Sequence, residues 1–148
     1  MLIQDKVLLS FLRENKWERP VYFSSTVSEA NRIGLDNYLS CVGIVNKLLL
    51  VEGKDILPEA LEKNLVQIYR FRYFNDPDTQ IDRSTLLLYN NFRHAFVQLV
   101  EHYINLGDKE KAKELFNVMN EKLPDWRYSD NQNKFIRYFE NVLENNID

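Results

Sequence analysis

The sequence predicts a mostly helical α+β fold with five or six helices, among them a helical hairpin, and a small two-strand β element. Three observations support this prediction. The 148 residues include 45% hydrophobic and 13% aromatic side chains but only 4 Gly and 4 Pro, a composition typical of a packed helical domain. Apolar residues recur at three- and four-residue steps through residues 84–124. Two short segments, Val21–Phe23 and Ile44–Val51, are rich in strand-forming residues.

The first part of the chain, residues 1–57, is predicted to hold one helix and both strands. A helix is expected over residues 5–15. Its inward face consists of four apolar residues: Val7, Leu8, Phe11 and Leu12. Proline disfavours helical geometry in the residue before it, so Arg19 is expected to be extended and Val21–Phe23 to form the first strand. The second strand is expected over Ile44–Val51.

Between the two strands the sequence indicates a short helix. Asp36 is a good N-cap, and the helix would carry Leu39 and Val42 on one face. Cys41 lies in the same apolar stretch and is expected to be a buried thiol. Because the chain contains one Cys, no internal disulfide can form.

The aromatic residues around the first strand allow two interpretations. In the first, Trp17, Tyr22 and Phe23 are buried and join the N-terminal helix to the strands. In the second, Trp17 and Arg19 line a groove. The sequence favours the first interpretation, because a tryptophan beside a strand usually packs into the core.

The second part, residues 58–148, is predicted to be helical and to form one soluble domain with the first, over residues 1–148. Pro58 suits the first turn of a helix, where its missing N–H would have no partner in any case. Residues 75–78 are expected to form a turn, after which Asp82 or Ser84 caps a long helix.

The long helix leads into a hairpin at about 84–124 that resembles a single tetratricopeptide unit. The matching residues are Phe96, Leu99, Tyr103, Gly107, Ala112, Phe116, Met119 and Pro124. Gly107 ends the first helix because glycine adopts positive φ without a Cβ clash, and Asp108 caps the second. One copy is present, whereas a repeat array needs about three for stability. A last helix is expected over 131–144.

Charge and hydropathy exclude several classes of function. The formal net charge of −3 offers no basic surface for nucleic acid. The longest apolar stretch, Gly43–Val51, is interrupted by Asn46 and Lys47 and is far shorter than the roughly 20 residues of a membrane-spanning helix. The N-terminus lacks the basic start and cleavage site of a signal peptide. We therefore expect either a cytosolic protein or a piece of a longer chain.

No constellation of residues indicates catalysis, a cofactor or a metal site. His94 and His102 are eight positions apart, about 80° around a helix, so they do not form the i,i+4 pair that shares a metal ion. Residues from Asp76 to Asp82 alternate like a calcium loop, but Ile81 stands where the turn requires glycine. We expect a capped turn there, and a chain that is not an enzyme and binds no cofactor or metal.

The segment Tyr69–Phe74 alternates aromatic residues with arginines and is the best candidate for a binding site. In one interpretation it is a helix end, where the arginines favour the C-terminal dipole and the aromatics fill a seam. In the other, Arg70 and Arg72 bind a partner beside rigid aromatic faces, a composition common at protein interfaces. The predicted partner-binding residues are Tyr69, Arg70, Arg72 and Tyr73, together with His94, Gln98 and His102 of the hairpin.

Residues 15–23, Asn-Lys-Trp-Glu-Arg-Pro-Val-Tyr-Phe, resemble the N-x-W-x-R-P-[IV]-Y-F segment of a known family. The segment belongs to the C-terminal soluble region of bacterial protein O-mannosyltransferase-like membrane glycosyltransferases. Three later features occur in the same order: residues 34–39 before an apolar run, residues 75–77 before a long helix, and a single hairpin that ends at 123–125. The resemblance extends over nearly the whole chain.

This resemblance implies an accessory domain on the periplasmic side of the bacterial inner membrane, without sugar-transfer activity of its own. Its partners would be the transmembrane catalytic region of the parent protein and an acceptor polypeptide. The alternative is a free-standing tetratricopeptide-like adaptor in the cytoplasm, which binds peptides on its hairpin face. Hydrophobic helices upstream in the native gene would distinguish the first hypothesis from the second.

Overall fold

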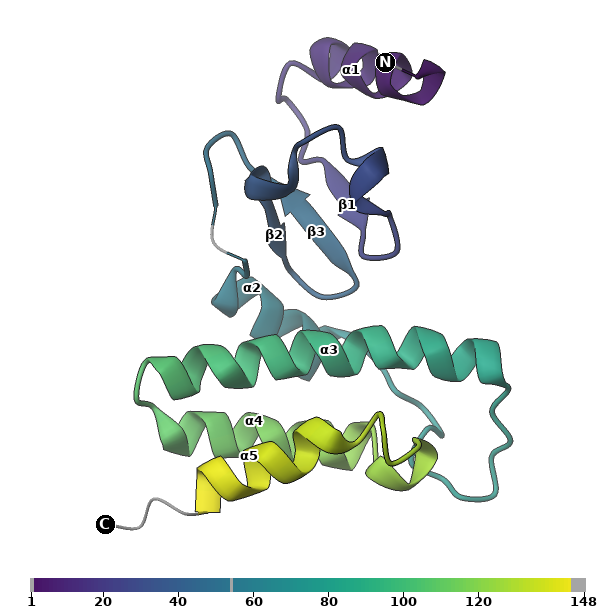
Figure 1. Ribbon diagram of the computed structural model, residues 1–148, viewed down its shortest axis with the longest axis vertical. Helices are drawn as coiled ribbons and strands as arrows, with labels where there is room; N and C mark the ends of the chain where they lie inside the picture. Colours follow the sequence, from purple (N-terminus) through teal and green to yellow (C-terminus); the bar gives the residue numbers. More distant parts are fainter. Residues whose placement is uncertain (1, 54, 145–148) are drawn as a thin grey trace. The chain divides into compact units, whose positions relative to one another are not determined.

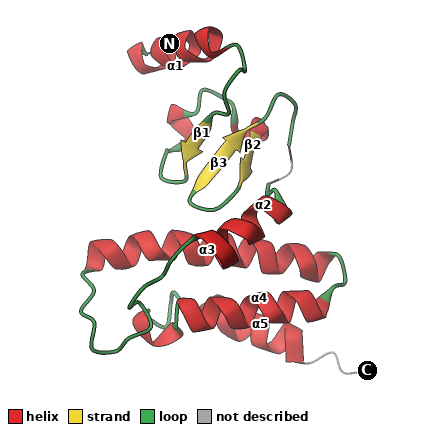
Figure 2. Cartoon of the chain, turned by 180° about the vertical axis from the view of Figure 1, so that it is seen from behind, coloured by secondary structure: helices red, strands yellow, loops and turns green. Residues whose placement is uncertain are grey.

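The computed structural model describes residues 2–53 and 55–144 (Figure 1). The chain divides into two compact units, Met1–Leu61 and Glu62–Asp148. The described residues hold five α-helices and one antiparallel sheet, with all the strands in the first unit (Figure 2). This architecture confirms the predicted mostly helical α+β class, including the helical hairpin.

The sheet of the first unit has three strands, one more than the sequence predicted. β1 is Tyr22–Ser24, β2 is Leu39–Cys41 and β3 is Val45–Leu48. β3 lies between the other two and is antiparallel to both. It is shorter than the expected strand Ile44–Val51, because the chain leaves the sheet after Leu48.

β2 replaces the short helix that was expected to carry Leu39. The helical part is a single 3-10 turn, Asp36–Tyr38, after which Leu39 pairs with Leu48 across the sheet. Local propensity did not reveal this pairing because it depends on a residue nine positions further along the chain. Cys41 is buried as expected, and desolvation raises the pKa of its thiol above the ordinary value.

α1, Ile3–Asn15, packs on the sheet through one side of the helix. The core of the unit is a cluster of three buried residues: Phe23, Leu39 and Leu48. Leu8 and Leu12 pack against this cluster, whereas Val7 and Phe11 are 63% and 55% exposed, contrary to the predicted inward face. Val7 and Phe11 lie about 100° around the helix from the two leucines, and a three-strand sheet covers one face of a helix.

The aromatic residues near β1 do not all enter the core. Phe23 is buried as expected, but Tyr22 is 49% exposed because successive side chains of a strand point to opposite faces. Trp17 is 47% exposed. Both Trp17 and the preceding Lys16 have a left-handed backbone conformation, which reverses the chain after α1. The expected burial of Trp17 and Tyr22 is therefore wrong.

The second unit is built on a hairpin of two helices, α3 at Arg83–Asn105 and α4 at Lys109–Lys122. Asp82 and Asp108 cap these helices, each accepting hydrogen bonds from backbone N–H groups of the first turn. Gly107 has a φ of 79° and ends α3, as the sequence predicted. The core between the helices includes Phe96, Leu99, Ala112, Leu115 and Met119.

Two further helices complete the described chain. α2, Pro58–Glu62, begins at the expected proline and continues as a π-helical segment, Lys63–Ile68. α5, Lys134–Glu144, packs on α4, where the rings of Phe116 and Phe139 meet edge to face at 6.0 Å. None of the helices in the described residues has the length and apolar content that crossing a membrane requires.

Candidate functional site

The candidate site begins where the π-helical segment ends. The backbone N–H of Tyr69 donates to the carbonyl of Asn64 at 2.8 Å and closes the last helical turn. Tyr69 itself is extended, with φ of −69° and ψ of 136°. The helix therefore ends before the aromatic–arginine segment, Tyr69–Phe74, which begins with extended backbone at Tyr69 and ends in a turn closed by the hydrogen bond from the N–H of Phe74 to the carbonyl of Phe71.

One side of the aromatic–arginine segment is anchored to α3 by ring contacts. The rings of Tyr69 and Phe71 meet Phe92 edge to face, with centroids 5.1 and 5.0 Å apart. The ring of Phe74 stacks on Tyr89 at 4.0 Å, and Phe74 is 1% exposed. These contacts hold the segment at both ends against one rigid helix.

The other side of the segment presents two arginines and a tyrosine to solvent. Arg70 and Arg72 are exposed, and Tyr73 is 69% exposed. Within residues 2–53 and 55–144, no carboxylate lies within 4.0 Å of either guanidinium group. Tyr73 also has a left-handed backbone, with φ of 60°. The segment thus offers two exposed positive charges next to an exposed aromatic ring.

Two cations distant in the sequence bond to the backbone at the end of the segment and on either side of it, and no sequence pattern indicated either. Arg127 donates hydrogen bonds to the backbone carbonyls of Phe74, Asp76 and Thr79, at 3.0 Å for Phe74 and 2.8 Å for Thr79. Lys122 donates to the carbonyl of Val66 at 3.1 Å. Both cations come from residues about 50 positions further along the chain, so spacing alone could not reveal their roles.

The turn that follows the segment is a capped turn, as predicted. The carboxylate of Asp76 accepts from the backbone N–H of Asp78 at 3.0 Å and from the hydroxyl of Thr79 at 3.1 Å. The same carboxylate is therefore already engaged in local hydrogen bonds. This geometry agrees with the turn interpretation of the alternating acidic residues.

The other predicted binding residues form a separate stripe on α3. His94, Gln98 and His102 are spaced by four residues, and His94 is exposed while Gln98 and His102 are half-buried. His94 lies about 200° around the helix from Phe92, which contacts the aromatic–arginine segment. The structure thus keeps the two groups of predicted residues apart. Four belong to the aromatic–arginine segment, and the three α3 residues lie on another face of the helix.

A buried cation that sequence reasoning missed lies on the inner side of α3. Arg93 is fully buried, with its Cζ 3.8 Å from the ring centroid of Tyr128 and 4.8 Å from that of Phe135. Its Nη2 donates to Oδ1 of Asn133 at 2.9 Å. Desolvation lowers the pKa of Arg93 and raises that of Tyr128. Arg93 links α3 to the segment before α5, and no sequence pattern indicated it.

Residues 1–66 match a known family. The family is described as TMEM260-associated domain 2. TMEM260 is a membrane O-mannosyltransferase-like protein. The match includes the whole first unit and the start of the second, and it contains the Asn15–Phe23 segment. No curated protein and no solved structure matches the chain.

Proposed function

We propose that this chain is a non-catalytic accessory module of a membrane O-mannosyltransferase-like protein, and that it binds the acceptor polypeptide through Arg70, Arg72 and Tyr73. The family match over residues 1–66 supports the accessory role. The exposed arginines on an anchored segment, which form no ion pair among the residues that the structure describes, are the observation that carries the binding role.

The chemistry of the segment suits a polypeptide partner. Guanidinium groups donate in a planar fork to carboxylates and backbone carbonyls, and tyrosine adds rigid contact area at low entropic cost. Because ring contacts to α3 already order the backbone, binding would order little more than three side chains. Preorganisation of this kind increases affinity without additional contacts.

The remaining features of the proposal follow from the accessory role. The module would lie on the extracytoplasmic side and contact the transmembrane catalytic region of the parent protein. A second candidate function is a free-standing adaptor, which the α3–α4 hairpin favours because two packed helices present a face suited to an extended peptide. Upstream membrane-spanning helices in the native gene would support the first function, and their absence would favour the second.

The proposal is tested by replacing both arginines in the native gene in its own host. For Arg70→Ala/Arg72→Ala we expect the occupancy of O-linked hexose on secreted proteins, measured by mass spectrometry of glycopeptides, to fall at least about fivefold. A fivefold loss corresponds to about 1 kcal/mol of binding free energy, the usual effect of truncating an important interface residue.

A matched control removes two exposed positive charges elsewhere in the second unit. Lys113→Ala/Arg137→Ala should leave occupancy unchanged. Thermal unfolding of the purified 148-residue chain should give the same midpoint for both double variants and the parent. Unchanged occupancy in Arg70→Ala/Arg72→Ala, or a lowered midpoint in that variant, would contradict the proposed binding role.

A further inference from the structure

An exposed tryptophan from a distant part of the sequence lies beside the end of the aromatic–arginine segment. Trp126 is 52% exposed, and the Cζ of Arg127 lies 4.2 Å from the centroid of its indole ring. The same Cζ lies 5.7 Å from the ring centroid of Phe74, the last residue of the segment. The guanidinium group of Arg127 therefore links the indole to the segment that we propose for acceptor binding.

Hydrogen bonds from Arg127 hold this arrangement in place. Its Nε donates to the carbonyl of Phe74 at 3.0 Å, and its Nη1 donates to the carbonyl of Thr79 at 2.8 Å. The 3-10 turn Asp125–Arg127 and the loop before α3 lie at the same end of the hairpin (Figure 1). Because the guanidinium group is fixed and stacks on the indole, binding of a partner would order little more of this surface.

Arg72 and Tyr73 occupy the tip of the turn that ends the segment. The N–H of Phe74 donates to the carbonyl of Phe71 at 3.3 Å, so Arg72 and Tyr73 are the two central residues of the turn. Tyr73 has a φ of 60° and is 69% exposed. Left-handed backbone in a bulky residue costs free energy and is concentrated at functional sites. The rings of Phe71 and Phe74, which pack on α3, hold the turn in this conformation.

The structure therefore brings three residue types together in the second unit. Trp126 comes from the turn after α4, whereas Arg72 and Tyr73 come from the loop before α3. Tryptophan, tyrosine and arginine are the residues that most often dominate the binding energy of protein interfaces. An exposed indole beside an exposed tyrosine and arginine thus extends the surface that the aromatic–arginine segment begins.

Charges distinguish the two ends of this surface. Arg70 and Arg72 are exposed at one end and form no ion pair among the residues that the structure describes. Two exposed carboxylates mark the other end: Asp125 directly precedes Trp126, and Asp78 lies in the loop that the neighbouring guanidinium group holds. A carboxylate of the partner is favoured near the arginines and disfavoured near the indole. An uncharged apolar side chain suits the indole instead.

We infer that Trp126 is a further contact residue of the acceptor-binding surface, and that the acceptor segment combines an acidic residue with an apolar residue a few positions away. The carboxylate binds to Arg70 and Arg72, and the apolar side chain packs on the indole and on Tyr73. This inference rests on the proposed function, because it names the chemistry that the same site recognises.

Peptide binding to the purified 148-residue chain tests the inference. The probes are short peptides selected against the chain from a random phage-displayed library and then synthesised. Trp17→Phe leaves Trp126 as the single tryptophan, so its fluorescence reports contact with the indole. We expect the selected peptides to pair an acidic with an apolar residue and to shift the emission of Trp126 to shorter wavelength. Replacing the acid by its amide, or the apolar residue by serine, should weaken binding at least about fivefold.

Variants of the protein assign the binding to this surface. Trp126→Ala and Arg70→Ala/Arg72→Ala should each weaken binding of the same peptides at least about fivefold. The shift of Trp126 emission needs no change at the tryptophan itself, so it decides the matter even if Trp126→Ala lowers the thermal midpoint.

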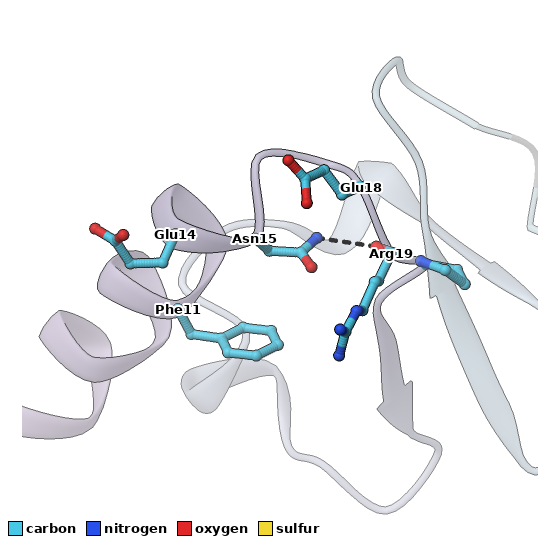
Figure 3. A pocket seen from close by; sticks show the side chains of 6 residues that line it. Phe11, Glu14, Asn15, Glu18 and Arg19 are labelled. Carbon is cyan, nitrogen blue, oxygen red and sulfur yellow. Dashed lines mark hydrogen bonds between the residues drawn. The ribbon is translucent and has the colours of Figure 1, made fainter.

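A matched control removes an equally exposed aromatic ring from the other unit. Phe11 is 55% exposed and borders a hollow of about 440 Å³ at the end of α1 (Figure 3). Most of the side chains that line this hollow are exposed. Phe11→Ala should leave the peptide affinity unchanged.

The outcomes separate this inference from the proposed function. Peptides whose binding depends on the two arginines, but which neither shift the emission of Trp126 nor bind Trp126→Ala more weakly, would overturn the inference and leave the proposed function intact. Selected peptides that keep their affinity when the acid becomes an amide would overturn the acidic class of acceptor. Binding that is insensitive to Arg70→Ala/Arg72→Ala, or a library that yields no binding peptide, would contradict both.

Discussion

At the scale of single residues, the guanidinium group of Arg93 has an unusual environment. It is fully buried between the rings of Tyr128 and Phe135, and among the described residues its Nε and Nη1 have no hydrogen-bond partner. Ring contacts compensate part of the lost hydration, because a desolvated cation–π pair contributes about 2 kcal/mol. Several kcal/mol of desolvation remain, so the side chain stabilises through packing more than through its charge.

Two substitutions of Arg93 separate packing from charge. Arg93→Met keeps a long flexible side chain and removes the buried charge, so the free energy of unfolding should stay unchanged or rise. Arg93→Ala leaves a cavity against Tyr128 and should lower it by about 2–4 kcal/mol. Urea unfolding monitored by circular dichroism measures both. Equal losses of unfolding free energy in Arg93→Met and Arg93→Ala would show that the charge itself is required.

At the scale of elements, the local chemistry of turns and caps predicted the second unit well. Asp108 and Gly107 occupy the cap positions that the sequence assigned to them, and of the two candidates Asp82 and Ser84 it is Asp82 that caps α3. Each of these features depends on residues within one helical turn, so the sequence contains all the information needed. The elements that sequence analysis missed or made too long, β2 and β3, depend on pairing across the sheet instead.

The cap of α4 provides a direct test of this local description. Oδ1 of Asp108 accepts from the backbone N–H of Lys111 at 3.1 Å. Asp108→Ala should lower the free energy of unfolding by about 1 kcal/mol, whereas Asp108→Asn, which keeps an acceptor at the same position, should cost less than half of that. Thermal and urea unfolding measure the stability of the two variants. An equal loss of unfolding free energy in both would contradict the capping role.

At the scale of the whole molecule, each compact unit has its own buried cluster. The first is centred on Phe23, Leu39 and Leu48, and the second on the facing residues of α3 and α4. The cluster of the first unit has three buried members supported by partly buried neighbours. A cluster this small should be sensitive to the loss of a single large side chain.

We therefore predict that Phe23→Ala destabilises the first unit selectively. Removal of a buried phenylalanine typically costs about 3–5 kcal/mol, which is a large part of the stability of a small unit. Hydrogen exchange measured by mass spectrometry should accelerate in residues 21–48 and stay unchanged in residues 95–119 of α3 and α4. Equal acceleration in both regions would show that the chain unfolds as one cooperative body.

As with the fold, one part of the candidate site could be predicted from the sequence and another part could not. Alternation of arginines with aromatics was enough to select Tyr69–Phe74, because each side chain's type is visible in the sequence. The sequence does not reveal which side of the segment is anchored, because the anchoring depends on contacts with Phe92 and Tyr89 of α3 and on the hydrogen bonds from Arg127.

The fold class, the hairpin with its caps, and the composition of the segment that we propose for binding could all be predicted without the structure. These features rest on interactions between residues a few positions apart, where periodicity and side-chain type decide the outcome. The tertiary structure alone decided the third strand, the exposure of Trp17 and Phe11, and the burial of Arg93. Each of these depends on which surfaces meet after the chain has folded, and burial is set by those non-local contacts rather than by local preference.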